Sequence, residues 1–424
     1  MIQTLRNAWS IPELRKKLIF TALILLIYRI GNVIPVPGID VGMMEDYFNS
    51  HLSNTILGLY NAMSGSAFSQ ATVLALGIQP YINASIIIQL LTVAIPALER
   101  MAKDEGEAGK KKIERITRYT TVALGLLLGF AYYMMIRNYE AQGFAIIADK
   151  GFLTAAVIIL AFAAGSSVVM WLGEQITEFG IGNGISMILF ANIISGLVPG
   201  GINNILALKW WEIIIVLVGV ALLILFIVFI NDAERRIPIQ YAKRVVGRKV
   251  YGGQSTNLPI KVSMSGVLPV IFAQSICSLP ATVCAFVRGG TEGWLYKNLF
   301  SPECVVYAIS YGVMIFFFSW FYSTIQFDPV EIANNLKKNG GFIPGFRPGK
   351  PTADFIKKVI SKIVVFGAVY LAIVALLPIV AGNLMSAHLA IGGTSVIIVV
   401  GVALETVKAL ETQMLMRHYK GFLD

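Results

Sequence analysis

Long apolar stretches separated by short polar segments make up most of the chain. Ten of these stretches are long enough to cross a bilayer as helices, since about 20 apolar residues span its hydrocarbon core. None carries a charged residue near its centre, and Arg29 and Glu405 lie toward the ends, where long side chains reach the interface. The pattern predicts membrane-spanning helices over 18–34, 75–95, 116–136, 152–172, 184–202, 210–230, 264–287, 304–325, 359–381 and 391–411.

Composition agrees with this pattern. The chain has 424 residues, of which 56% are hydrophobic and 14% are charged, and its mean hydropathy is +0.72. Soluble domains carry about 25% charged residues, so a soluble enzyme, a disordered chain and a disulfide scaffold are excluded. The three cysteines and three histidines show no CxxC or HExxH spacing, and we expect neither a metal site nor a cofactor. The fold class predicted is an all-α polytopic membrane protein.

The distribution of lysine and arginine predicts how the chain is oriented. Of the 34 such residues, 28 fall in the segments on the side that holds both termini, 5 fall on the opposite side, and Arg29 lies within the first span. Basic residues are enriched in cytoplasmic loops, so both termini and the long basic loops 232–261 and 326–362 are expected in the cytoplasm. The loop 173–183 carries Glu174 and Glu178 without a basic residue and is an exception. A net charge of +10 also favours contact with anionic lipid headgroups, acidic protein or RNA.

The segment 55–73 is apolar in part and rich in Gly, Ser and Ala, but it is too short and too polar to cross alone. One interpretation is a surface helix of an outer loop. The other is a re-entrant half-helix packed inside the bundle, where small residues permit close packing and irregular backbone is tolerated. We favour re-entry.

The second span combines an apolar stripe with a polar one. Ile78, Ile82 and Ile86 recur every fourth residue, and Gln79 and Asn83 form the neighbouring stripe. Two interpretations stay open at this point. The helix is either buried with its amides satisfied, or it lines a water-filled path that a ring of apolar side chains narrows.

The seventh span has a similar mixture. It contains Pro269, Gln274, Ser275 and Pro280, and two prolines with interior polar groups indicate a helix that bends or moves.

The span centres lack the groups that drive coupled transport or catalysis. Proton- and sodium-coupled transporters usually carry ionisable residues at the midplane, whereas these centres offer neutral polar groups alone. No nucleophile–base set or carboxylate pair appears there, so the chain is not expected to be an enzyme. A passage for something large and chemically varied is favoured over two alternatives, a secondary transporter and a membrane-embedded enzyme.

Two basic loops carry candidate docking residues. In loop 232–261 apolar and polar residues alternate through Arg236–Ile239 and Val245–Tyr251, and Gly252–Gly253 supplies a turn, which predicts a hairpin. In loop 326–362 prolines and glycines stiffen a tip around Arg347. Lipid headgroups alone would explain loose basic tails. Structured loops are more typical of a docking site for a protein or ribonucleoprotein.

Several long motifs, distributed over the whole chain, resemble the SecY family of protein-conducting channels. They are RIGNVIPVPGID (29–40), LGIQPYINASIIIQLL (76–91), GIGNGIS (180–186), YAKRVVGRKVYGGQSTNLPIKV (241–262), GVLPVIFAQSI (266–276), FIPGFRPGKPT (342–352) and GGTSVIIVV (392–400).

The resemblance implies an hourglass of two pseudo-symmetric five-helix halves, 1–202 and 203–424, with 55–73 as a plug. It implies a lateral gate between the second and seventh spans, through which apolar segments pass into lipid. The apolar ring at the waist would comprise Ile78, Ile82, Ile86, Ile185, Leu189, Ile271 and Ile398, Leu189 being a departure in residue type. The lateral gate would include Asn83, Gln89, Gln274 and Ser275.

The resemblance also implies partners and a location. The docking residues would be Lys243, Arg248, Lys249 and Arg347, which would contact the ribosome or the motor ATPase SecA. The family works with two small membrane subunits, SecE and SecG, and its substrates are polypeptides that carry signal peptides. A bacterial cytoplasmic membrane follows as the expected location.

Overall fold

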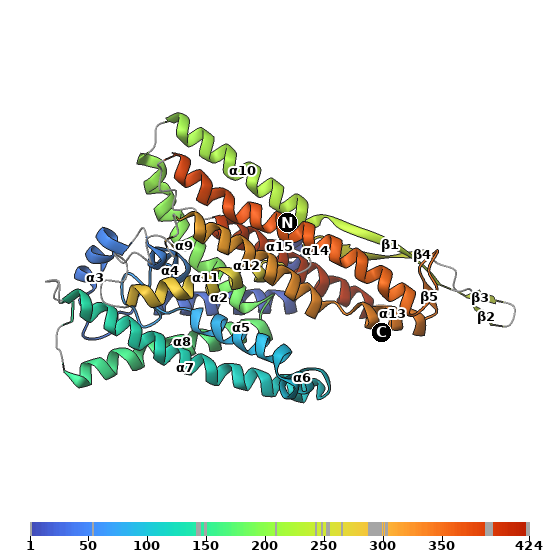
Figure 1. The fold of residues 1–424 in the computed structure, drawn as a ribbon, viewed down its shortest axis with the longest axis horizontal. Helices are drawn as coiled ribbons and strands as arrows, with labels where there is room; N and C mark the ends of the chain where they lie inside the picture. The colour runs from blue at the N-terminus through green and yellow to red at the C-terminus, as the bar shows by residue number, and fades with distance from the viewer. Residues whose placement is uncertain are drawn as a thin grey trace.

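The chain folds into an elongated helical bundle in the computed structural model (Figure 1). Most helices run roughly along the long axis, and a narrow β-ribbon projects beyond them at one end, here called the sheet end. The opposite end holds α3 (Val41–Tyr47) and α4 (Ile56–Ser64). The structure describes residues 2–52, 55–140, 146–147, 151–207, 210–241, 244–246, 249–251, 255–263, 266–286, 299, 301, 304–385 and 393–420.

Every predicted span coincides with a helix of the structure. These helices are α2 (Pro12–Gly31), α5 (Gln79–Ala94), α7 (Gly106–Glu140), α8 (Phe152–Phe179), α9 (Gly184–Ala207), α10 (Trp210–Asp232), α11 (Leu268–Phe286), α12 (Val305–Gln326), α14 (Lys350–Met385) and α15 (Gly393–Lys420). Within the described residues, five helices are long and apolar enough to span a membrane, or six if a bent pair is one span. The remaining helices are α1 (Ile2–Ser10), α6 (Pro96–Lys103), α13 (Pro329–Lys338) and a short π-helix, η1 (Phe48–Leu52).

Several predicted ends are wrong by about a helical turn or more, because hydropathy locates apolar length and not helix termini. α7 begins at Gly106 rather than 116, α8 continues to Phe179, and α14 begins at Lys350. The second span begins four residues later than predicted, at Gln79. It ends at Ala94. Ile95 is extended and Pro96 begins α6, so the chain bends by 105° between α5 and α6.

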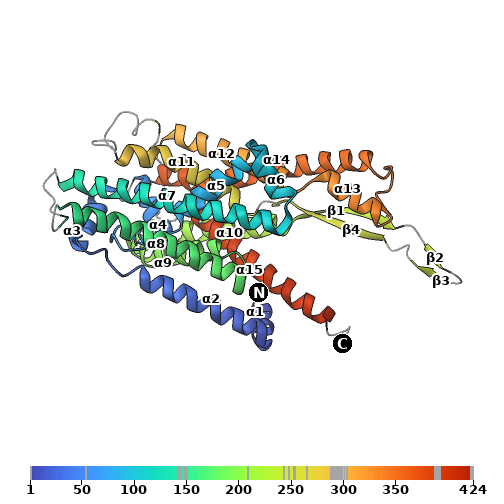
Figure 2. The ribbon, with the colours of Figure 1, turned by 90° about the horizontal axis from the view of Figure 1, so that it is seen from below.

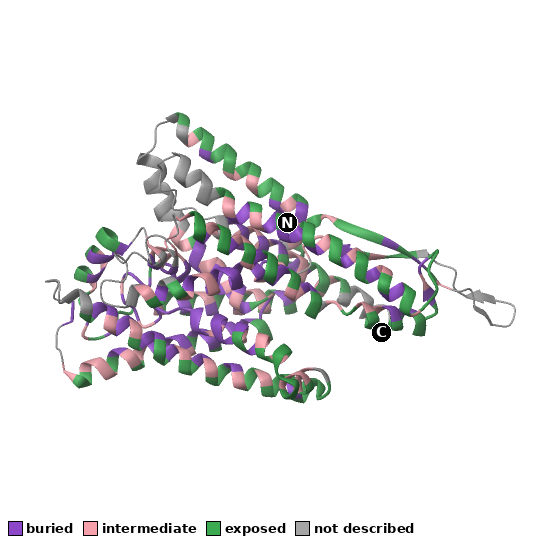
Figure 3. Cartoon of the chain, viewed as in Figure 1, coloured by how far each residue is buried: buried purple, intermediate pink, exposed green. Residues whose placement is uncertain are grey.

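The helices form two packed groups along the chain. In the first part α7 packs against α5 and α8, and α8 packs against α2 and α9. In the second part α12 packs against α11 and α14, and α15 packs against α10 and α14. The groups meet where α11 contacts α4, α5 and α7, and where α15 contacts α9. Buried residues concentrate between the groups, whereas the outer face of α10 is exposed (Figure 3).

The predicted hairpin is confirmed, but the predicted stretch 245–251 folds back on itself. β1 (Glu234–Tyr241) pairs antiparallel with β4 (Ser255–Lys261), with Ile237 opposite Leu258, and β5 (Gly341–Phe342) joins the other edge of β1. The stretch 245–251 is not one strand, because β2 (Arg244–Val246) pairs back onto β3 (Lys249–Tyr251). Gly252–Gly253 lies outside the described residues.

The alternation along β1 explains why the ribbon is held in place at its base. Ile237 and Ile239 point to one face and are 2% exposed each. They pack with Leu336 of α13 and with Ile356 and Ile360 of α14. A period of two in the sequence therefore attaches the ribbon to the helices at the sheet end.

Candidate functional site

All seven predicted ring residues meet in one apolar cluster where the two helix groups touch. Six of them are at most 2% exposed, and Ile185 packs against the cluster half-buried. Six of them come from α5, α9, α11 and α15, and Ile78 immediately precedes α5. Side chains as far apart in the chain as Ile78 and Ile398 are thus brought together.

The register of α5 points its isoleucines inward. Ile82 and Ile86 are one helical turn apart on the same face. Ile78 is not inside the helix as predicted but is the residue just before it, following a turn in which Gly77 has a left-handed φ of 54°. The turn keeps the side chain of Ile78 buried beside the other two.

A cavity of about 710 Å³ lies against this cluster. Ile82, Ile185 and Ile271 form part of its lining, together with polar groups of α5 such as Ser85 and Gln89. Six charged side chains also line it, namely Lys111, Glu114, Arg115, Arg118, Glu174 and Glu178. The cavity therefore joins a charged wall to three of the predicted ring residues.

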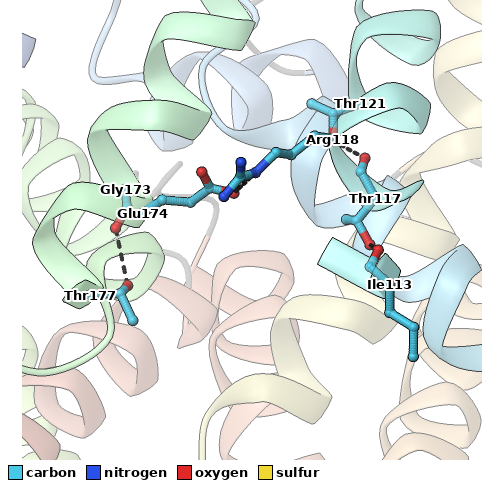
Figure 4. A network of polar contacts seen from close by, with 7 residues as sticks. All are labelled: Ile113, Thr117, Arg118, Thr121, Gly173, Glu174 and Thr177. Carbon is cyan, nitrogen blue, oxygen red and sulfur yellow. Dashed lines mark hydrogen bonds and ion pairs between the residues drawn. The ribbon is translucent and has the colours of Figure 1, made fainter. Parts of the chain in front are cut away.

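An ion pair crosses the cavity wall between α7 and α8 (Figure 4). Arg118 Nε donates to Glu174 Oε1 at 2.9 Å, and the two side chains are 50% and 21% exposed. Threonines nearby bond back to their own helices, as Thr177 does to the Gly173 carbonyl at 3.0 Å. An exposed pair of this kind contributes about 1 kcal/mol or less to stability. Its main consequence is that the cavity wall is charged while the positive charge of Arg118 is balanced by the negative charge of Glu174.

The predicted gate residue Gln89 bridges the two helix groups. Its Nε2 donates to Ser85 Oγ on the same helix at 3.2 Å, and its Oε1 accepts a hydrogen bond from Tyr322 of α12. The ring of Tyr322 also packs 5.2 Å from that of Phe272 on α11. A hydrogen bond and an aromatic contact therefore connect α5, α11 and α12.

The other predicted gate residues are buried near the same junction. Gln274 Nε2 approaches Met63 Sδ at 3.5 Å, and Gln79 Nε2 approaches the same sulfur at 3.2 Å from the other helix group. The polar oxygens of Asn83, Gln274 and Ser275 have no hydrogen-bond partner among the described residues. Unsatisfied polar atoms cost free energy when buried. The junction therefore holds several buried polar atoms that have no hydrogen-bond partner among the described residues.

Residues 55–73 are packed inside the bundle and do not form a surface helix. α4 contacts both α9 and α11, and Leu57 and Ala67 are fully buried. Thr55 caps the start of α4 by accepting from the Leu57 N–H, and Gly65 ends it in the left-handed conformation that favours glycine. Met63 belongs to the same cluster as the predicted ring residues, so the segment packs directly against that cluster.

Comparison with known proteins decides the family. A family model described as SecY matches residues 72–407. Two relatives, both described as protein translocase subunit SecY, align along the full length of the chain. The one from Streptomyces galbus is 43% identical with both chains fully covered, and the one from Thermotoga maritima is 41% identical, covering 100% of this chain and 98% of its own. The chain belongs to the SecY family.

Solved structures of low identity agree with the SecY fold. One described as a protein conducting channel superimposes with a TM-score of 0.67 at 18% identity, over 97% of each chain. Canine Sec61 in a ribosome–channel complex gives a TM-score of 0.62 at 18% identity, also over 97% of each chain. SecY proteins are multi-pass, non-enzymatic channel subunits of the protein translocase, which confirms the predictions of a membrane channel and of no catalytic activity.

Of the docking residues predicted from the SecY resemblance, Arg347 and Lys249 are described, and both lie at the sheet end. Arg347 is exposed in a turn in which Gly345 and Gly349 adopt left-handed φ angles of 88° and 105°. Thr352 Oγ1 fixes this turn by donating to the Arg347 carbonyl at 2.8 Å. Lys249 belongs to β3, whereas Lys243 and Arg248 lie outside the described residues.

Sequence reasoning missed the contacts that four residues make around this site. Tyr322 and Met63 make their polar contacts with residues remote in sequence, and the Arg118–Glu174 pair joins positions 56 apart. Only the Arg118–Glu174 pair has a signal in the sequence, because Arg118 and Glu174 each lie near the end of a predicted span on the same side of the membrane.

Proposed function

We propose that the chain is the pore-forming subunit of a channel that passes unfolded secretory polypeptides across the bacterial cytoplasmic membrane. The ring of seven aliphatic side chains carries the proposal. Such a ring contacts any extended chain without recognising its sequence, because it offers no fixed hydrogen bonds. It also opposes ion passage, since a dry constriction strips ions of their hydration.

The cavity supports this assignment. Its charged wall suits a water-filled entrance, and its apolar side is formed by Ile82, Ile185 and Ile271. We place the sheet end and both termini in the cytoplasm, because basic residues accumulate on that side. The cavity is then the cytoplasmic entrance, and residues 55–73 are the plug beyond the ring. The two helix groups correspond to halves 1–202 and 203–424.

The proposed partners follow from the family. SecE and SecG would complete the membrane complex, and anionic lipids would surround it. SecA or the ribosome would deliver signal-peptide-bearing polypeptides at the sheet end. Lys243, Arg248, Lys249 and Arg347 are the residues we propose for that contact. The solved relatives bound to ribosomes, canine Sec61 and yeast Ssh1, make the ribosome a reasonable candidate.

Cross-linking from the ring tests the function. In a channel whose native cysteines are replaced by serine, Ile82→Cys should cross-link to a secretory chain stalled in transit, because the chain must pass the ring. Leu225→Cys on α10 is the matched control, since that side chain is 65% exposed on the outer surface of the bundle. Equal cross-linking from both positions, or none from either, contradicts the proposal.

The Tyr322–Gln89 hydrogen bond should oppose opening of the lateral gate. Tyr322→Phe removes a bond worth about 1 kcal/mol, so the open population should rise about fivefold. We expect a several-fold gain in export of a precursor whose signal peptide is weakened, measured as the fraction processed. Tyr370→Phe is the control, because that buried hydroxyl has no hydrogen-bond partner among the described residues. Equal export by both variants would show that the bond does not hold the gate.

A further inference from the structure

The β-ribbon leaves the helix bundle between the end of α10 and the start of α11. Its strand β1 follows α10, and its strand β4 precedes α11. The Val262 N–H donates to the Ala233 carbonyl at 2.9 Å and joins the two strands where they leave the bundle. We call residues 231–233 and 261–262 the ribbon root. A displacement of the ribbon reaches α10 and α11 through this root.

Three residues of α15 form a stripe that faces the root and the start of α11. Gly401, Glu405 and Lys408 are spaced four and three positions apart, so they lie on one face of the helix. A Cβ at Gly401 would overlap the side chain of Val267, the residue just before α11. The absence of a side chain at Gly401 therefore lets α15 approach the start of α11 closely.

Lys408 lies at the C-terminal end of α10. Its Nζ donates to the Asn231 carbonyl at 3.3 Å and forms an ion pair with Asp232 Oδ1 at 2.8 Å. The last carbonyls of a helix have no partners inside the helix, and that end carries a partial negative charge. A lysine at this position satisfies both requirements.

Glu405 lies at the N-terminal end of α11, where the helix charge is opposite. Its carboxylate accepts a hydrogen bond from the Val267 N–H, and the Val267 carbonyl accepts from the Val270 N–H at 3.1 Å in the first turn of α11. An anion is stabilising at this end of a helix. Gly266 has a φ of 60°, and a Cβ there would overlap Glu405 Oε1, so glycine is needed for both reasons.

The root has further neighbours on α14 and within the ribbon itself. A Cβ at Gly367 of α14 would lie 2.7 Å from the Val262 carbonyl, so α14 packs closely against the backbone of the root. The positive charge of Lys261, in the root, also acts on Glu405. Close backbone packing on α14 and charged contacts on α15 therefore hold the root together.

We propose that Glu405 and Lys408 are positioning residues that fix the ribbon root and the start of α11 to α15. The two side chains set where the ribbon is anchored and where α11, one side of the proposed lateral gate, begins. Their importance for transport rests on the proposed function, whereas their hold on the root does not. The proposal also gives Glu405, which the sequence predicts to reach the interface, a backbone partner.

Amide hydrogen exchange in the complete resting channel complex tests the hold on the root. Glu405→Gln should speed exchange about fivefold in the peptides that contain Val262 and Val267, because a charged acceptor is replaced by a neutral one. Glu405→Asp should restore most of the protection, since the charge is kept. Glu411→Gln is the matched control, because this exposed glutamate of α15 contacts Thr4 instead of the root. It should exchange as the wild type does.

Exchanging the two charges separates this proposal from a simple pair within α15. Residues three apart on a helix can attract each other, and the double variant Glu405→Lys, Lys408→Glu keeps that attraction. It also places a cation at the N-terminal end of α11 and an anion beside Asp232. We therefore expect faster exchange in the double variant than in either Glu405→Gln or Lys408→Gln. Wild-type protection in the double variant overturns the proposal.

ATP-dependent uptake of a precursor into vesicles supplied with SecA tests the consequence for transport. Glu405→Gln should lower the maximal rate several-fold and leave the half-saturating SecA concentration unchanged, because the exposed docking residues are not altered. Glu405→Asp should recover the rate. An unchanged maximal rate, an equal loss in Glu411→Gln, or unchanged exchange in Glu405→Gln overturns the proposal. If Glu405→Gln does not fold, Lys408→Gln is measured in the same two ways. Failure of the Ile82 cross-link would instead count against the transport function, because exchange in the resting channel does not depend on transport.

Discussion

Replacing Ile82 and Ile86 together with asparagine should raise the resting ion conductance of the reconstituted channel about tenfold or more, which corresponds to a barrier lowered by ~1.4 kcal/mol or more. Both side chains are 2% exposed within the cluster that holds the other ring residues. Amide groups at these positions would offer hydrogen bonds to water and weaken the dewetting that excludes ions. The measurement is single-channel current across a planar bilayer without substrate.

The control for this substitution lies on the same helix. Ile87 is 38% exposed and points away from the ring, so Ile87→Asn changes residue type equally without wetting the constriction. Its conductance should equal that of the wild type. If a folded Ile82→Asn, Ile86→Asn channel conducts no more than the control, the seven residues do not form the ion barrier, although they remain part of the core.

The sequence predicted the helices well because apolar length and charge bias are local properties. The second span shows where prediction from local sequence patterns fails. Its isoleucine stripe was readable at a spacing of four, yet the first member, Ile78, lies before the helix because Gly77 turns the chain there. The interpretation of 55–73 had two alternatives because its burial depends on α9 and α11, which follow more than a hundred residues later.

The polar contacts of the site were beyond sequence reasoning for the same physical reason. The SecY resemblance predicts Gln89 as a gate residue, but its partner Tyr322 lies 233 positions away in an aromatic-rich span that has the pattern of an ordinary lipid-facing helix. The sequence predicts that Arg29 reaches the lipid interface, because it lies near the end of a span. Its actual partner is a backbone carbonyl, and a carbonyl leaves no mark in the sequence. Side-chain pairs can be guessed from charge, whereas side-chain to backbone contacts cannot.

Arg347→Glu should reduce motor-driven export about tenfold or more while leaving the amount of folded channel in the membrane unchanged. The side chain is exposed, and the described hydrogen bond in this turn uses its backbone carbonyl, so the substitution leaves the turn intact. Reversing a charge at a contact between proteins replaces attraction by repulsion, which costs several kcal/mol. ATP-dependent uptake of a precursor into inverted membrane vesicles supplied with SecA measures the effect.

Lys337→Glu provides the matched control, since it reverses an exposed positive charge on α13 at the same sheet end but outside the stiffened turn. Long-range steering of an acidic partner would be weakened equally by either change, and raised salt would abolish the difference from wild type. A specific contact would instead make Arg347→Glu much the more severe of the two at every salt concentration, because a partner seated on the turn excludes solvent from that one guanidinium. Wild-type uptake by Arg347→Glu would remove this residue from the docking surface, and the case for a partner at the sheet end would then depend on the β-ribbon alone.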